Sequence, residues 1–297
     1  MKRLILSASL VIAVAAGAHS PPGELFFAAQ FPDNLVPTMD GNLSDWDIVP
    51  LDPYTIRSDR LYSPVADIQP VGRGELDASD MVIRHLVGWN DNSNKIYVAS
   101  EVFDDIHNTD REDAARFNHD DAWEIEVNPD HTATEDHNPE GLATNFSYKW
   151  AVPPVEGQYQ FYRPNAALSW LVDGSSWVDF GWGFTGDQFG ESTYFYELAV
   201  TPIEVMPRSN DTTEDQAVVH DLEEEEIIHI SMTVGDIDEA TSGDFVLTSY
   251  QGFWTLSPES CCTATNDFVM APVEPSIAAL SETAVEEVTW GQIKAGF

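Results

Sequence analysis

The chain has 297 residues, and 43% of them are hydrophobic, which is enough for one large domain or two small ones with a real core. Its 51 Asp and Glu residues outnumber its 13 Lys and Arg residues, giving a formal net charge of -38. Because such a surface repels phosphate backbones and anionic lipids, the composition argues against nucleic acid or a lipid surface as partner. We interpret the carboxylates as a solvated, salt-adapted exterior, with divalent-cation sites as the alternative.

The first 18 residues have the pattern of a secretory signal peptide. Lys2-Arg3 precedes an apolar run from Leu4 to Ala16, and Ala16-Gly17-Ala18 fits the small-x-small cleavage pattern. We predict cleavage after Ala18, with Ala28-Ala29 as the alternative, and hence a secreted protein that is extracellular or periplasmic. The apolar run is too short to span a bilayer comfortably, and no later segment qualifies as transmembrane.

Residues 19–34 contain Pro21, Pro22 and Gly23, and we predict that they form a loose leader before a folded part that begins near Leu35. Residues 52–80 are rich in turn-forming residues and have few periodic apolar runs. This composition indicates a long ordered loop or an insertion.

From Met81 onward the chain shows a succession of short strand patterns. A polar turn at residues 90–94 joins two β-rich runs into a hairpin. In residues 122–128, Trp123, Ile125 and Val127 alternate with acidic or amide residues, so one face is apolar and the other polar. We therefore predict an all-β chain, an antiparallel β-sandwich of immunoglobulin or jelly-roll type. The expected strands are 81–89, 95–102, 122–128, 145–152, 158–162, 192–200, 226–234, 245–250 and 268–270.

Several segments between and after these strands have other compositions. Residues 169–190, with Trp170, Trp177 and Trp182, are interpreted as a Gly- and Asp-rich loop over the edge of the sandwich. Cys261 and Cys262 are adjacent, which fits either a strained vicinal disulfide or free or intermolecular thiols. We place the domain at 35–273 and a linker with a C-terminal tail at 274–297. Trp290, Ile293 and Phe297 have helical spacing, so the tail either docks, serves as a handle for a protein partner or frays.

These segments together resemble carbohydrate-binding module family 9 and its DOMON-like relatives. The order and spacing of the motifs carry the resemblance, which covers residues 35–273. The matching motifs are Met39-Asp40-Gly41 with Trp46, Trp89-Asn90 through Ile96-Tyr97-Val98, Val102-Phe103-Asp104, Asp121-Ala122-Trp123-Glu124-Ile125, Tyr194 to Pro202 through Glu197, and Glu226 to Asp238.

The resemblance implies a site in which two aromatic rings hold a sugar and charged side chains bind its hydroxyls. The family carboxylate falls on Glu124 and the basic residue on Lys149. The first aromatic falls on Asn118, beside Phe117. The second has no clear match, and Phe253 and Trp254 are nearest to it, so we take Phe117, Glu124, Lys149 and Trp254 as candidate ligand-binding residues.

Carboxylates at strand ends also suggest a metal site. Asp40, Asp104, Asp236 and Asp238 are candidate calcium ligands, because calcium prefers hard oxygen atoms. None of them matches the spacing of an EF-hand loop.

The sequence predicts a secreted, non-catalytic carbohydrate-binding protein, an accessory module in polysaccharide breakdown. It has no GxSxG, HExxH, P-loop or Rossmann glycine motif, which lowers the case for an enzyme without removing it. One alternative is a surface or adhesion protein whose tail binds a partner. Another is a haem-binding module with Met206 or Met232 and His229 as iron ligands.

Overall fold

The computed structural model describes residues 19–63, 76–109, 120–131, 141–153, 160–163, 168–171, 174–187, 190–238, 252–258 and 266–283. Strands dominate, and none of the described helices is long and apolar enough to cross a membrane. The strands are β1 (Leu25–Gln30), β2 (Thr55–Arg57), β3 (Met81–Asn90), β4 (Lys95–Asp104), β5 (Trp123–Asn128), β6 (Leu142–Ala143), β7 (Phe146–Trp150), β8 (Gln160–Arg163), β9 (Val178–Gly186), β10 (Ser192–Val200), β11 (Ile203–Pro207), β12 (Val218–Val219), β13 (Ile227–Asp236), β14 (Gly252–Thr255) and β15 (Asp267–Met270).

Helical segments are short. They are the single turn α1 (Leu51–Tyr54), the 3-10 turns η1 (Asp33–Leu35), η2 (Leu43–Ile48), η3 (Ser58–Arg60), η6 (Ser169–Leu171) and η7 (Glu214–Gln216), and a helix over residues 275–283.

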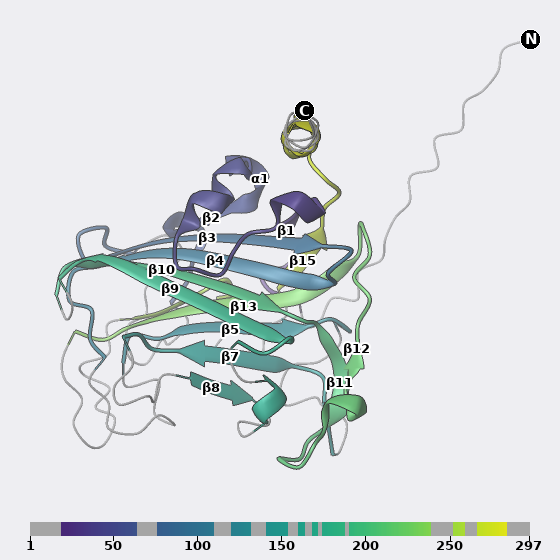
Figure 1. Ribbon diagram of the computed structural model, residues 1–297. Coiled ribbons are helices and arrows are strands. Elements are labelled where there is room, and N and C mark those ends of the chain that lie inside the picture. Colours follow the sequence, from purple (N-terminus) through teal and green to yellow (C-terminus); the bar gives the residue numbers. More distant parts are fainter. Residues whose placement is uncertain are drawn as a thin grey trace, which may run out of the picture.

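The strands form a curled sheet that folds into two layers (Figure 1). Its order is β8-β7-β5-β13-β15-β1-β3-β4-β10-β9, with β14 beside β13 and β2 beside β3. Neighbouring strands are antiparallel except at β1, which pairs in parallel with β15 over Leu25–Ala28 and with β3 at Ala29 and Gln30. The strand β1 therefore links the two layers, and the predicted antiparallel β-sandwich is confirmed.

Aromatic side chains from both layers fill the main core. Trp123 on β5 stacks on Tyr196 of β10 at 5.3 Å, and Trp150 on β7 stacks on Phe180 of β9 at 4.2 Å, both between ring centroids. The two-residue period of each strand puts these rings between the layers. Truncating such a buried ring to alanine costs about 3 to 5 kcal/mol.

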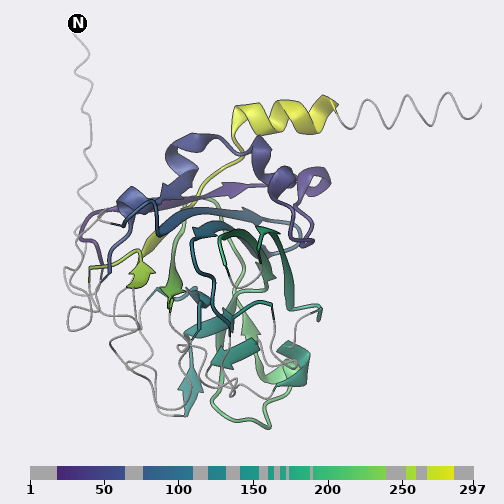
Figure 2. The same ribbon diagram turned by 90° about the vertical axis from the view of Figure 1, so that its left-hand side faces the viewer.

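A second apolar cluster lies on the outer face of the layer that contains β3 and β4. Phe31 meets Trp46 and Tyr97 edge to face, with centroids 5.3 and 6.1 Å apart. The segment from Phe31 to Tyr54 and the helix 275–283 cover this face, and Ile277 of the helix is fully buried (Figure 2). The residues after 283, including the predicted partner-binding tail, lie outside the described part, as do residues 1–18 and Cys261-Cys262.

The Asp40-Gly41 and Trp46 motifs meet at one buried carboxylate, Glu197 on β10. Its Oε2 accepts hydrogen bonds from the backbone N–H groups of Asp40, Gly41 and Asn42 at 3.1, 2.7 and 3.2 Å. Its Oε1 accepts one from Trp46 Nε1 at 3.0 Å. Burial raises the pKa of Glu197, and these donors oppose the rise. The Asp-Gly and Trp motifs thus anchor the outer segment to the sheet.

The folded part begins earlier than predicted. Residues 19–34 were expected to be a loose leader, but Leu25–Gln30 form β1, and Ser20 is 2% exposed. The run Leu-Phe-Phe-Ala-Ala lacks the alternation of a half-exposed strand because β1 is flanked by strands and largely covered on both faces.

The segment with three tryptophans is also different from the prediction. Residues 178–186 form strand β9 rather than a loop, and Trp177 is buried. The glycines that suggested a loop are needed for close packing. A Cβ at Gly181 would collide with the backbone of Met39, and one at Gly41, whose φ is +79°, with the backbone of Trp182.

Candidate functional site

Glu124 and Lys149, the charged pair implied by the resemblance, lie opposite each other on β5 and β7. Lys149 Nζ donates to Glu124 Oε1, and the two residues are only 1% and 4% exposed, respectively. The Ser147 hydroxyl donates to Glu126 Oε1 at 2.6 Å. Burial alone would raise the pKa of Glu126, but Lys149 and Ser147 overcome it and the pKa is lowered. The structure thus brings the predicted pair together, with its charges already neutralised.

The predicted aromatic partners of this pair do not gather around it. Phe117 lies outside the described residues. Trp254 is 3% exposed and lies opposite Val234, on the core face of β14. Phe253, its neighbour in sequence, lies opposite Gly235 and therefore on the same face as Glu124. A shift of one residue changes the face of a strand, so Phe253, and not Trp254, shares the face of Glu124.

Three of the four predicted metal ligands come together at one end of the strands. Asp104 ends β4, Asp236 ends β13, and Asp238 follows two residues later. Asp40 does not join them, because it lies in the outer segment anchored by Glu197. Two groups of side chains have possible ligand atoms within 4.8 Å of one another. The first group is Asp104, His107 and Asp121, and the second is Asp80, Asp105 and Asp238. We call them, with Asp236, the acid cluster.

Within the described part of the chain, neither Asp80 nor Asp236 forms an ion pair with Lys or Arg. Burial, followed by neighbouring carboxylates, raises the pKa of Asp236 to about 9 and that of Asp80 to about 6. The buried Oδ2 atoms of Asp104 and Asp236 receive no hydrogen bond. Buried carboxylate oxygens that lack donors fit a divalent cation such as calcium.

His107 adds a further acceptor to the acid cluster. Its Nε2 lies 2.6 Å from the carbonyl oxygen of Val152, so Nε2 carries a proton and donates it. In the neutral ring Nδ1 is then an acceptor, and it faces Asp104 Oδ2 at 3.4 Å and Asp121 Oδ2 at 3.7 Å. Three acceptors facing one another require either a proton or a cation between them.

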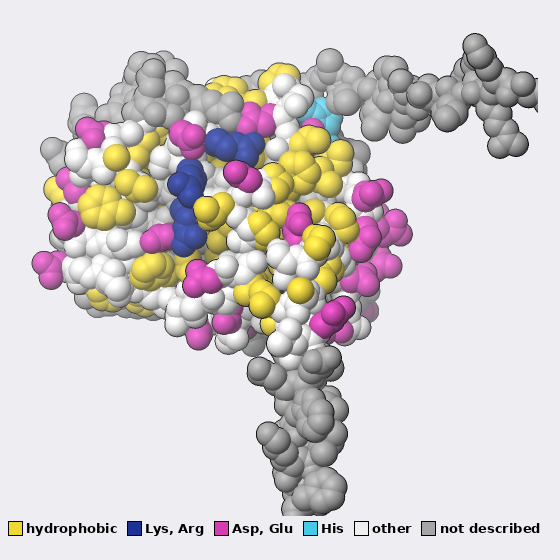
Figure 3. All heavy atoms as spheres, turned by 90° about the horizontal axis from the view of Figure 1, so that it is seen from above, with side chains coloured by type: hydrophobic (Ala, Val, Ile, Leu, Met, Phe, Trp, Pro, Cys, Tyr) yellow, Lys and Arg dark blue, Asp and Glu magenta, His cyan; other side chains and the backbone are white. Residues whose placement is uncertain are grey.

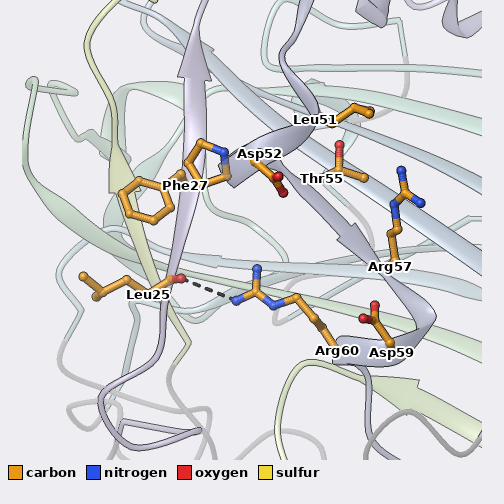
Figure 4. A pocket seen from close by; sticks show the side chains of 9 residues that line it. Leu25, Phe27, Leu51, Asp52, Thr55, Arg57, Asp59 and Arg60 are labelled. Atoms are coloured by element: carbon orange, nitrogen blue, oxygen red, sulfur yellow. Dashed lines mark hydrogen bonds between the residues drawn. The ribbon is translucent and has the colours of Figure 1, made fainter.

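An open hollow of 590 Å³ lies on the outer side of the sandwich, between β1, α1, β2 and η3 (Figure 4). Phe27 and Pro53 give it an apolar wall, and Asp52, Thr55 and Arg57 give it polar groups. A pocket of this size suits a small ligand. A second hollow of 400 Å³ adjoins it through shared Leu51 and Thr55. The two linings include Arg57, Arg60 and Arg84. Seen from above, the molecule has basic side chains beside apolar and acidic ones (Figure 3).

The two arginines of the larger hollow differ in their contacts. Arg60 donates to Glu24 Oε1 at 2.6 Å, and its guanidinium lies 4.4 Å from the centroid of Phe26. Arg57 is exposed, and it makes no hydrogen bond or ion pair in the described structure. Residues 52–80 have the composition of a loop, so the sequence did not indicate this hollow. The feature of the sequence that could have indicated it is the pair Arg57 and Arg60, in a chain with only 13 Lys and Arg.

The proposed haem ligands do not share a site. His229 and Met232 are both buried on β13, but three residues along a strand place them on opposite faces. His229 Nδ1 already accepts the N–H of Asn266 at 2.8 Å. Met206 lies on β11, in a separate small sheet. The pairing of Met232 with His229 is therefore wrong.

Neither a protein-family model nor a curated protein matches the chain. Among solved structures, it is similar to a carbohydrate-binding module family 9 from Caldicellulosiruptor kristjanssonii in complex with cellotriose, at 12% identity and a TM-score of 0.49, covering 84% of this chain and 95% of that one. The structure of a family 9 module from the same organism in complex with glucose has 12% identity and a TM-score of 0.49. That match covers 84% of this chain and 96% of the other. Likeness at this level carries no conclusion about what this chain binds.

Proposed function

We propose that this protein is a secreted, non-catalytic carbohydrate-binding protein and that the hollow beside Phe27 and Arg57 receives the sugar. The supporting observation is an open cavity with an apolar ring wall on one side and charged and hydroxyl groups on the other. The C–H face of a sugar ring packs on Phe27 and Pro53, and Asp52, Thr55 and Arg57 bind its hydroxyls. Secretion is supported by the signal pattern of residues 1–18.

One side chain of the hollow, Arg57, favours one class of glycan. Arg57 is exposed without a partner among the described residues, in a chain of net charge -38. A guanidinium binds carboxylate and sulfate groups through paired N–H donors. We therefore expect polymers that carry uronic acid or sulfate groups to be retained more strongly than neutral glucans, and the difference to shrink in high salt.

Affinity electrophoresis on a panel of neutral and acidic polysaccharides tests this function. Phe27→Ala and Arg57→Ala should each lose retention, whereas Arg208→Ala, which removes an equal charge from an exposed site outside both hollows, should keep it. Absence of retention on every polysaccharide would contradict the proposal. If only Lys149→Met loses retention, the sugar site lies at Glu124 and Lys149 and not in the hollow. Incubation with the bound polymer should release no reducing ends.

The acid cluster supports a structural role for calcium beside this function. Asp104, Asp236 and Asp238 would supply hard oxygen ligands, and the bound cation would replace the proton that burial and neighbouring carboxylates favour on Asp236.

A further inference from the structure

Three side chains that no motif singled out converge near the start of the described chain. His19 Nδ1 lies 2.6 Å from Asp267 Oδ1, and His131 Nε2 lies 2.9 Å from the same oxygen. The two imidazole rings are 4.8 Å apart between centroids. His19, His131 and Asp267 come from distant parts of the sequence, so the fold, not local sequence, creates this group.

The group is held in place by its surroundings. Asn266 Nδ2 donates to the carbonyl oxygen of Ser20 at 2.5 Å, and the Ser20 and Ser257 hydroxyls are 2.7 Å apart. His131 has a left-handed backbone, with a φ of 55°, after the turn that ends β5. Non-glycine residues in this region of backbone space concentrate at functional sites.

The spacing of the three atoms fits a bound metal ion. Two ligands at right angles around an ion, each about 2.0 to 2.1 Å from it, lie roughly 2.9 Å apart. The side chains of His19, His131 and Asp267 are 21%, 20% and 11% exposed, so an ion reaches them from solvent without unfolding.

The predicted cleavage after Ala18 changes what His19 offers. It makes His19 the first residue, and its backbone nitrogen, an amide in the precursor, becomes a free amine. An amine and an Nδ1 of one residue chelate a single ion, and His131 Nε2 adds a third nitrogen. Three nitrogen ligands with one carboxylate oxygen suit tetragonal Cu(II), which also leads the divalent first-row series in affinity.

We propose that removal of residues 1–18 creates a Cu(II) site, with His19 binding through its amine and Nδ1, His131 through Nε2 and Asp267 through its carboxylate. The site depends on cleavage at Ala18 and not on sugar binding. Before cleavage the amine is missing, so the precursor binds copper far more weakly. Export thus couples to metal binding.

Titration with copper sulfate before and after release of the N-terminus tests the proposal. The protein is made as a fusion joined directly to His19 and cut by a protease that leaves no extra residue. The released protein should bind Cu(II) at least 100-fold more tightly than the uncut fusion. It should also give an axial electron paramagnetic resonance spectrum with nitrogen hyperfine splitting. Equal affinity before and after the cut would overturn the proposal.

Matched histidine variants separate this site from adventitious binding. His131→Gln should lower the affinity at least 30-fold and alter the spectrum. His220→Gln, at another half-buried histidine beside carboxylates, should change neither. Melting without copper checks that both variants fold. Wild-type affinity in His131→Gln, or an exported protein whose N-terminal sequence does not start at His19, would also overturn the proposal.

Discussion

Buried carboxylates occur in two regions that differ in what neutralises them. On β5, Glu124 and Glu126 share Lys149, and the pKa of Glu126 is lowered. In the acid cluster no Lys or Arg is among the described contacts of Asp236, and burial with neighbouring carboxylates raises its pKa to about 9. The chain has 13 Lys and Arg against 51 Asp and Glu, so a buried lysine is a scarce resource. Lys149 therefore marks the region where the protein supplies its own cation. The acid cluster, without a lysine among the described contacts of Asp236, is where a cation from solution fits.

Removal of Lys149, which neutralises Glu124 and Glu126, should have the largest effect on stability. Lys149→Met leaves Glu124 and Glu126 buried without their cation, and we expect the free energy of unfolding to fall by about 3 to 5 kcal/mol. Urea denaturation measures this change. The double variant Lys149→Met/Glu124→Leu should recover part of the loss. A loss below about 1 kcal/mol in the single variant would show that the pair is not stabilised as a unit.

Addition of calcium to the acid cluster should have the next largest effect on stability. Calcium at about 100 times its dissociation constant should add about 2.7 kcal/mol, seen as a higher melting temperature than in a chelator. Asp236→Asn removes a carboxyl group whose raised pKa of about 9 forces it to take up a proton on folding at neutral pH. It should stabilise the chelator-treated protein by about 1 to 3 kcal/mol and reduce the gain from calcium. Identical melting with calcium and with chelator would argue against a cation in the acid cluster.

Glu197 is a third buried carboxylate, and it is stabilised by N–H donors instead of a lysine or a metal ion. Trp46→Phe keeps an aromatic ring but removes the indole donor 3.0 Å from Glu197 Oε1. Because hydrogen bonds to charged groups are worth about 1.5 to 3 kcal/mol, we expect a loss near the lower end of that range. Trp170→Phe, whose indole donates to the neutral carbonyl of Thr212, is the control and should lose less. Chemical denaturation of the two variants compares them.

The smallest expected effect is at the surface, where His220 supplies the positive charge. A hydrogen bond to Glu226 raises the pKa of His220, aided by nearby Glu204 and opposed by burial. The stabilisation that comes from a raised folded-state pKa is fully present below the ordinary histidine pKa of about 6.5. It is lost as the pH rises through the folded-state pKa. The stability difference between wild type and His220→Gln should therefore be larger at low pH than at high pH. Partial exposure keeps it below about 1 kcal/mol.

The sequence predicted those strands whose apolar residues alternate, and it failed where they do not. Strands β3, β4, β5 and β10 lie within about two residues of their predicted positions. Strand β1 is apolar on both faces and follows a proline-rich turn, and β9 is rich in glycine, so neither has the signature of a half-buried strand.

For the candidate sites, sequence could supply residues but not their neighbours. The resemblance identified Glu124 and Lys149, which pair with each other. Strand ends identified Asp104, Asp236 and Asp238, which lie near one another. The contribution of Asp80 and His107 depends on loops that return to the same end of the sheet. The hollow at Arg57 depends on α1 and β2 lying beside β1, which no local pattern reveals.

The position of β1 has a consequence for how the chain assembles. Its partner β15 lies near the other end of the chain, with Leu25 beside Asp267. The two layers therefore cannot be joined until residue 270 has been synthesised, and such long-range pairing is slow. During synthesis the growing chain therefore lacks its linking strand pair until nearly all of it has been made.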